Sequence, residues 1–184
     1  MFRILVISFI LNFYNPALSS TKEKIISQIQ LTNNLSFNFI QTIDNKNENG
    51  KCVIRYPKKI WCEYDNSNKK IIVSNGKSLV IKTANNGSYY RYPLDKTPLV
   101  FLLDKEYLIS KMNILKPREI DNKYLNFTIF ENNNEINIFF DKKNLLFVGW
   151  QTEDIYQNLS ITFISSVKIN QKIDNKIFVL PKNN

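Results

Sequence analysis

The sequence predicts a mainly β protein with one antiparallel sheet of about ten or eleven strands and two or more short helices. Three observations predict this fold class. Apolar and polar residues alternate with a period of two in short runs from residue 35 onward, which is typical of strands with one buried face. Turn-forming residues separate these runs at hairpin spacing. Strands do not alternate with long helices, so a parallel β-α-β sheet is excluded, and a sheet of this size is expected to curl.

The N-terminus has the form of a cleavable export signal covering residues 1–19. Arg3 precedes an apolar run over residues 4–13 that is too short to span a bilayer. Ala17 and Ser19 supply the small residues that a signal peptidase requires. We therefore expect a soluble mature protein that begins near Ser20, in an exported, oxidising compartment. Position 20 is not cysteine, so we expect no lipid anchor there.

A short helix is expected directly after this signal. Ser20 and Glu23 have the spacing of a capping box. Ile25, Ile26 and Ile29 then share one side of a helix that ends near residues 33–34.

Strands follow from Leu35, and Phe37, Phe39 and Gln41 form one face of the first. The segment 44–50 is expected to be a polar turn. Ser74-Asn75-Gly76 is a strong hairpin signal. The next expected strands are 51–56, 60–64, 71–73, 77–83 and 88–92.

A second short helix is expected in the middle of the chain. Thr97 has the position of an N-cap, Pro98 that of the first helical residue, and Leu99, Leu102 and Leu103 are spaced for one helical face. Strands then resume. They are expected at 114–119, 125–130, 136–140, 145–150, 159–164 and 178–180.

The strand pattern defines one face that is richer in apolar residues. In the hairpin that reverses at Pro57, Cys52, Ile54 and Tyr56 face the same way as Ile60, Cys62 and Tyr64. The same alternation continues on other strands, at Leu79, Ile81, Leu125, Phe127, Ile129, Ile136, Ile138, Phe140, Leu159, Ile161 and Phe163. These residues fill a dry core or line a cavity. A sheet this large with so few helical residues has too little helix to cover its concave face, which favours a cavity.

Cys52 and Cys62 lie symmetrically about Pro57, so they oppose each other if the turn is centred there. An oxidising compartment would allow a disulfide between them. Two buried thiols are the alternative reading.

Composition excludes most familiar active sites. The chain has no histidine and two cysteines, which rules out Ser-His-Asp and Cys-His catalysis and the common zinc sites. The net charge is +9, but the arginines are few and no lysine run exceeds two, so we expect solvating lysines and no nucleic-acid binding. Mild attraction to anionic membrane surfaces is a secondary alternative. The arginines are Arg3, Arg55, Arg91 and Arg118.

Several segments, in this order, resemble the LolA family, the periplasmic carriers of outer-membrane lipoproteins. They are Phe39-Ile40-Gln41, Gly50, Arg55-Tyr56-Pro57, Trp61 with Tyr64, the run from Ile72 to Leu79, and the run from Tyr92 to Leu99. The run from Val73 to Leu79 and the run from Tyr92 to Leu103 are the most specific, because each joins a turn or cap to flanking apolar residues.

The resemblance implies a strongly curved, incomplete antiparallel β-barrel closed by an α-helical lid over an apolar cavity. Residues 20–184 would form a single lipoprotein-carrier domain in the periplasm of a Gram-negative bacterium. The cargo would be acylated lipoproteins, the donor an inner-membrane ATP-driven release complex, and the acceptor an outer-membrane receptor or the outer membrane itself. A monomer without cofactor or metal is expected.

On this resemblance, two groups of residues form the site. The expected lipid-binding residues are Phe37, Phe39, Ile54, Tyr56, Ile60, Tyr64, Leu79, Ile81, Leu125, Phe127, Ile129, Phe140 and Phe163. The expected lid residues are Ile25, Ile26, Ile29, Leu99, Leu102 and Leu103, for which ordinary packing of helix on sheet is the alternative.

One position departs from the family. Its members commonly carry an arginine before the proline of this strand, where it helps to latch the lid, and here that residue is Tyr56. Arg55 should face outward, since side chains alternate along a strand. The Tyr56 hydroxyl could instead bond a lid carbonyl.

Two other function classes remain to be weighed. One is a glycosidase, which needs a pair of carboxylates. Nothing in the spacing of the acidic residues requires such a pair, so we expect no enzyme. The candidate residues are Glu63, Asp65, Asp95, Asp104, Glu106, Asp141, Glu153 and Asp154. The second is a fixed lipid- or lipoprotein-binding or sensing module. A receptor of this kind normally has a lipidated cysteine after the signal, and a sensor would need further domains.

Overall fold

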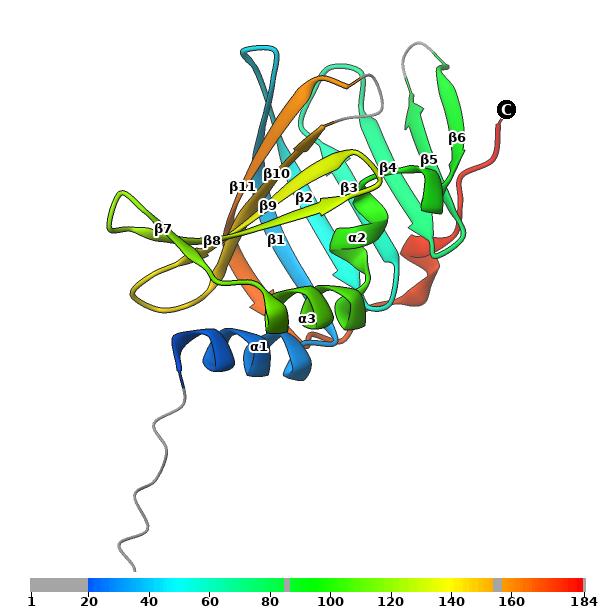
Figure 1. The fold of residues 1–184 in the computed structure, drawn as a ribbon. Coiled ribbons are helices and arrows are strands. Elements are labelled where there is room, and N and C mark those ends of the chain that lie inside the picture. The colour runs from blue at the N-terminus through cyan, green and yellow to red at the C-terminus, as the bar shows by residue number, and fades with distance from the viewer. Residues whose placement is uncertain (1–19, 85–86, 154–156, 184) are drawn as a thin grey trace, which may run out of the picture.

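The computed structural model describes residues 20–84, 87–153 and 157–183. Within these residues, all strands belong to one 11-stranded antiparallel sheet, in the order β6-β5-β4-β3-β2-β1-β11-β10-β9-β8-β7. The sheet bends strongly and its edge strands β6 and β7 do not pair, so the barrel stays open (Figure 1). The predicted fold class, an incomplete antiparallel barrel with few short helices, is confirmed.

The sheet consists of two meanders joined through the pairing of β1 with β11. The first comprises β1 (Asn34–Ile43), β2 (Lys46–Arg55), β3 (Lys59–Tyr64), β4 (Lys70–Asn75), β5 (Ser78–Thr83) and β6 (Tyr89–Pro93). The second comprises β7 (Arg118–Ile120), β8 (Tyr124–Glu131), β9 (Asn134–Asp141), β10 (Phe147–Glu153) and β11 (Leu159–Ile169).

Three α-helices lie on the concave side and at one end of the sheet (Figure 1). They are α1 (Thr21–Leu31), α2 (Leu99–Leu103) and α3 (Lys105–Ile114), with 3₁₀ turns η1 (Leu94–Lys96) and η2 (Asn175–Phe178). The capping box of α1 is confirmed, because Ser20 Oγ accepts from Glu23 N at 3.2 Å and Ser20 N donates to Glu23 Oε2 at 2.7 Å. None of the described helices has the length and apolar character needed to cross a membrane.

The main core lies between these helices and the concave face, and it includes Ile25, Leu103, Met112 and Phe127, which are fully buried. A smaller apolar group lies on the convex face, where η2 contacts β3 and β4. It consists of Val73, Val80 and Phe178, at 2%, 0% and 3% exposure. The C-terminal segment therefore covers part of the outer surface.

Helix α3 corrects the predicted strand at 114–119. The Asp104 side chain caps it by accepting from Tyr107 N at 3.2 Å, and Leu108, Ile109 and Met112 bury one helical face. The helix ends at Ile114, and the strand that follows is only β7. The apparent alternation at 114–119 spans the junction of the two elements.

Three smaller predictions were also wrong. Most of the expected turn at 44–50 is strand, because Asp44 and Asn45 alone turn the chain, with φ of 49° and 61°, and Lys46 already pairs with Ile43. The expected strand at 178–180 is not formed, because Phe178 is the last residue of η2, which Asp174 caps by accepting from Lys176 N. Thr97 is no N-cap of α2, since its hydroxyl donates to Leu94 O at 2.8 Å.

Candidate functional site

A first cavity of about 280 Å³ lies between the helices and the concave face. Its lining is almost wholly apolar. It includes Ile29 of α1, Leu99 and Leu102 of α2, Leu108 and Met112 of α3, and Ile54, Tyr56, Ile138, Phe140, Phe147, Trp150 and Val167 of the sheet. We call it the helix-side cavity.

The helix-side cavity reaches the surface among exposed apolar residues. Leu31, Leu146 and Ile169 line it and are 71%, 49% and 53% exposed. Grouped apolar residues at a surface mark a binding site or an entrance more often than isolated ones do. An apolar ligand could therefore enter between the end of α1 and the strands β10 and β11.

A second cavity of about 420 Å³ lies farther along the concave face, against β1 to β6. We call it the strand-side cavity. Along β1, the helix-side cavity touches Leu35, whereas the strand-side cavity touches Phe39, Gln41 and Ile43. Leu99 and Trp150 line both cavities, so α2 and β10 supply the partition.

Phe39 and Tyr64 meet edge to face in the strand-side cavity, with ring centroids 4.9 Å apart. Gly50 permits this arrangement. A Cβ atom at Gly50 would lie 2.8 Å from the Phe39 ring and 2.2 Å from Glu63 O, which is closer than real contacts allow. Burial, reinforced by Glu48, raises the pKa of the Tyr64 hydroxyl above its ordinary value, so it stays protonated at neutral pH.

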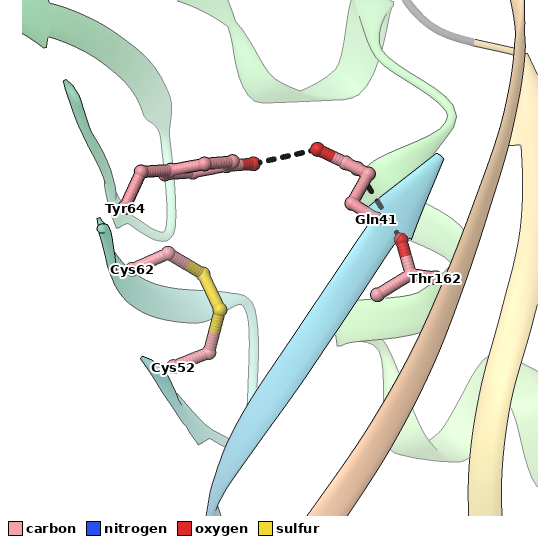
Figure 2. The surroundings of a disulfide bond; sticks show 5 residues. All are labelled: Gln41, Cys52, Cys62, Tyr64 and Thr162. Carbon is pink, nitrogen blue, oxygen red and sulfur yellow. Dashed lines mark hydrogen bonds between the residues drawn. A yellow bond between two sulfur atoms is a disulfide. The ribbon is translucent and has the colours of Figure 1, made fainter. Parts of the chain in front are cut away.

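A polar group crosses the same cavity (Figure 2). The Tyr64 hydroxyl donates to Gln41 Oε1 at 2.9 Å, and Gln41 Nε2 donates to Ser160 Oγ at 3.1 Å and to Thr162 Oγ1 at 3.2 Å. Nearby, Thr152 also lines the cavity, and in the part of the chain that the structure describes its buried hydroxyl has no hydrogen-bond partner. Sequence reasoning missed this group, because its residues come from distant parts of the chain.

Cys52 and Cys62 also line the strand-side cavity, joined by a disulfide with an S–S distance of 1.99 Å (Figure 2). Their strands pair in the register that the sequence predicts, with Cys52 opposite Cys62 and Ile54 opposite Ile60. The shared face of this hairpin is buried, as expected.

The structure divides the expected lipid-binding residues among four locations. Ile54, Tyr56 and Phe140 line the helix-side cavity. Phe39, Ile60, Tyr64, Leu79 and Ile81 line the strand-side cavity. Phe37, Leu125, Phe127 and Ile129 are buried core residues outside both linings. Phe163 is on the opposite face.

The assignment of Phe163 was wrong, because the face of β11 was misjudged by one residue. Phe163 is 45% exposed and stacks on Phe139 on the convex side, with ring centroids 6.5 Å apart. The inward residues are Ser160, Thr162 and Ile164. Apolar residues occupy both faces of this strand, and the Gln41 hydrogen bonds hold the polar pair Ser160 and Thr162 inside.

Four of the six expected lid residues are buried, whereas Ile29 and Leu99 are partly buried. Ile29, Leu99 and Leu102 line cavities, whereas Ile25, Ile26 and Leu103 are 0%, 7% and 0% exposed and belong to the core. Sequence reasoning missed the contribution of α3, whose Leu108 and Met112 line the helix-side cavity. Its helical spacing of apolar residues after Asp104 was the available signal.

Helix α2 is not attached to the sheet by the hydrogen bond that was expected from the Tyr56 hydroxyl to a lid carbonyl. Tyr56 faces inward and Arg55 outward, toward Asn175 Oδ1, so the strand register is as expected. In the described part of the chain, however, the Tyr56 hydroxyl makes no hydrogen bond to a lid carbonyl. Instead Lys58 N donates to Leu103 O at 2.7 Å, and Lys58 Nζ lies 3.0 Å from Asp104 Oδ2.

Helix α3 is held at both ends. Lys105 Nζ donates to Gln30 O of α1 at 3.0 Å. On the sheet side, Glu131 accepts from Lys111 at 2.7 Å and from the Tyr107 hydroxyl at 3.0 Å. The hydrogen bond from Lys111 is the main reason that the pKa of Glu131 lies below its ordinary value, and the bond from Tyr107 acts in the same direction.

The candidate catalytic carboxylates have mostly structural contacts. Glu63 pairs with Lys51, Asp104 caps α3, and Asp141 accepts from two turn amides, while Glu153 lines the strand-side cavity. Asp154 lies outside the described residues. In the described ranges, no three acidic or cysteine side chains form a group able to hold a metal ion.

Comparisons with known proteins agree with this architecture. The family model described as outer membrane lipoprotein carrier protein LolA matches residues 30–181. No curated protein matches the sequence significantly. An uncharacterized conserved protein from Thermus thermophilus shares the fold, with a TM-score of 0.52 and 7% identity over 89% of this chain and 96% of that chain. A LolA superfamily protein from Nitrosomonas europaea aligns with a TM-score of 0.45 and 10% identity over 88% of this chain and 99% of that chain. Because the family model covers most of the sequence, this chain belongs to the LolA family.

Proposed function

We propose that this protein is a soluble periplasmic carrier that shields the acyl chains of lipoproteins and transfers them from the inner to the outer membrane. The helix-side cavity is the observation that carries the proposal. It is apolar, opens among Leu31, Leu146 and Ile169, and is covered by short helices. The LolA family fold is of a lipoprotein-binding type, which supports the same reading.

The physical mechanism is an exchange of apolar contacts. Each buried acyl methylene contributes about 0.8 kcal/mol, so several full-length chains would bind too tightly to be released if nothing opposed them. Leu99 and Leu102 already occupy the concave face. A ligand must displace these side chains, and their return helps to expel it. No covalent step is required, and we propose no catalytic activity.

The family also suggests the location and the partners. Residues 1–19, which lie outside the described residues, would direct export. The donor would be an ATP-driven release complex of the inner membrane, and the acceptor an outer-membrane receptor or the membrane itself. We propose that the carrier acts as a monomer, without cofactor or metal.

Cargo capture tests the proposal directly. The protein is recovered from the periplasm of its host, and acylated lipoproteins bound to it are identified by mass spectrometry. Leu31→Glu places a charge at the cavity mouth and should reduce the bound lipoprotein. Ile114→Glu is the matched control, because Ile114 is similarly exposed, at 79% against 71%, and does not line either cavity.

A transfer assay separates the carrier from a fixed binding module. Loaded protein is mixed with vesicles of outer-membrane lipid and any receptor, and lipoprotein in the vesicles is measured. A carrier delivers its cargo, whereas a fixed module retains it. Absence of bound lipoprotein in the first experiment would contradict both.

A further inference from the structure

Thr152 presents an unusual buried hydroxyl to the strand-side cavity. Its side chain is inside the fold, with the residue 8% exposed, and among the described residues Oγ1 has no hydrogen-bond partner. Buried hydroxyls in proteins are nearly always bonded, because an unpaired one loses its bonds to water without replacement. A ligand atom that completes this bond would account for it.

The neighbouring hydroxyls show which kind of ligand atom fits. The Tyr64 hydroxyl donates to Gln41 Oε1, so the Gln41 amide nitrogen faces Ser160 and Thr162 and both of these hydroxyls accept from it. Their own hydrogens remain available, because within the described residues neither side chain donates a hydrogen bond. The group therefore offers donors, and its natural partner is an acceptor.

The donors lie close together on neighbouring strands. Thr152 of β10 is the cross-strand partner of Ser160 of β11, and Thr162, two residues along the same face, is the partner of Gln41 on β1. Beyond them the cavity continues as an apolar wall toward Leu99 and Trp150. A fitting ligand thus has an acceptor oxygen at one end and a hydrocarbon chain at the other.

The local charges exclude a free carboxylate as the preferred acceptor. Lys70 is the cation at this cavity, and it is already paired with Glu48. Glu153 also lines the cavity and adds negative charge. A neutral carbonyl oxygen suits this environment better than an anion.

We propose that Thr152, with Ser160 and Thr162, binds the ester or amide carbonyl of one fatty acyl chain, whose hydrocarbon lies in the strand-side cavity. This inference rests on the proposed function, since it concerns acylated cargo. It gives the strand-side cavity a recognition site for the polar end of the chain, and it fixes how far one chain enters.

A matched pair of soluble lipids tests the carbonyl. 1-Decanoylglycerol and 1-O-decylglycerol differ in the ester carbonyl, which the ether lacks. Their binding to the mature protein is measured by calorimetry below the critical micelle concentrations, with decanoate as a third probe. We expect the ester to bind about two- to tenfold more tightly than the ether, which corresponds to one neutral hydrogen bond. Decanoate should bind more weakly than the ester.

Substitutions at position 152 assign the effect. Thr152→Val keeps the side-chain shape and removes the hydroxyl, so it should abolish the preference for the ester without weakening the ether. Thr152→Ser should retain the preference. Thr42→Val is the control, because the Thr42 hydroxyl bonds to Asn47 Oδ1 at 2.7 Å and Thr42 lines neither cavity.

The outcomes separate this inference from the proposed function. Equal binding of ester and ether, a preference that survives Thr152→Val, or tighter binding of decanoate would overturn the carbonyl site and leave the acyl carrier standing. Failure of all three probes to bind would contradict the carrier proposal itself, and this inference with it.

Discussion

The backbone N–H of Lys58 donates a hydrogen bond of 2.7 Å to the carbonyl oxygen of Leu103. This bond joins the β2–β3 turn to the last residue of α2, the helix that lines both cavities. The ion pair between Lys58 Nζ and Asp104 Oδ2, at 3.0 Å, reinforces it. The β2–β3 turn therefore supplies the attachment that holds α2 against the sheet.

Lys58→Met should loosen this attachment. The substitution removes the ion pair and leaves the backbone bond, so we expect hydrogen exchange of the amide at position 58 and over 99–103 to become about two- to fivefold faster, as the loss of one exposed ion pair implies. Lys51→Met is the control, because Lys51 pairs with Glu63 at 2.8 Å away from the helices. Equal acceleration in both variants would show that the ion pair has no specific role in holding α2.

Tyr56→Phe should leave the exchange of residues 97–103 within about twofold of the original protein, because among the described residues the Tyr56 hydroxyl has no hydrogen-bond partner to lose. The ring would still fill its place in the helix-side cavity. Arg55→Gln should also spare α2, since Arg55 bonds to Asn175 on the convex side. Faster exchange over 97–103 in Tyr56→Phe alone would show that Tyr56 latches the lid after all.

The disulfide between Cys52 and Cys62 should be present in the exported protein, so alkylation before reduction should label no thiol. It closes a loop with a sequence separation of 10. The double substitution Cys52→Ala and Cys62→Ala should lower the free energy of unfolding by about 2–3 kcal/mol, because the unfolded chain gains entropy. Urea denaturation measures this. A reductant should destabilise the original protein and leave the variant unchanged; two labelled thiols in the untreated protein would contradict the prediction.

Glu131 should make the attachment of α3 dependent on pH. Hydrogen bonds from Lys111 and Tyr107 hold the folded-state pKa of Glu131 below its ordinary value of 4.5. The carboxylate therefore stabilises the fold above its unfolded pKa, and this contribution disappears as the pH falls through the lower folded pKa.

Thermal unfolding between neutral and acidic pH tests this dependence. Glu131→Gln should unfold at a lower temperature than the original protein at pH 7, and the difference should shrink in acid. Glu63→Gln, whose ion pair with Lys51 lies away from α3, is the comparison variant. A difference between Glu131→Gln and the original protein that is constant with pH would show that the carboxylate charge is not responsible.

The exported protein should begin near Ser20, directly before the first helical residue Thr21. Sequencing the N-terminus of protein recovered from the periplasm checks this expectation. Recovery from the membrane with residues 4–13 intact would show that the segment is an anchor.

The sequence by itself determined the features that depend on local pattern. Alternation of polar and apolar residues set the inward face of the hairpin that carries Cys52 and Cys62, because a strand side chain can point only to one of two faces. The spacing of Ser20 and Glu23 set the start of α1, since a capping box is a contact within one turn. The order of several such short segments was enough to indicate the family.

The tertiary structure decided everything that depends on long-range contacts. The alternation in β11 predicted that Phe163 faces inward, but Thr162 does, and it bonds to Gln41 of β1, 121 residues away. The backbone hydrogen bond that attaches α2 is donated by the N–H of Lys58, a group that every residue except proline has. The identity of the residue therefore does not predict this bond. The concave face has two cavities because Leu99 of α2 and Trp150 of β10 lie between them. Which space stays empty depends on how the whole chain packs, so the sequence pattern does not predict it.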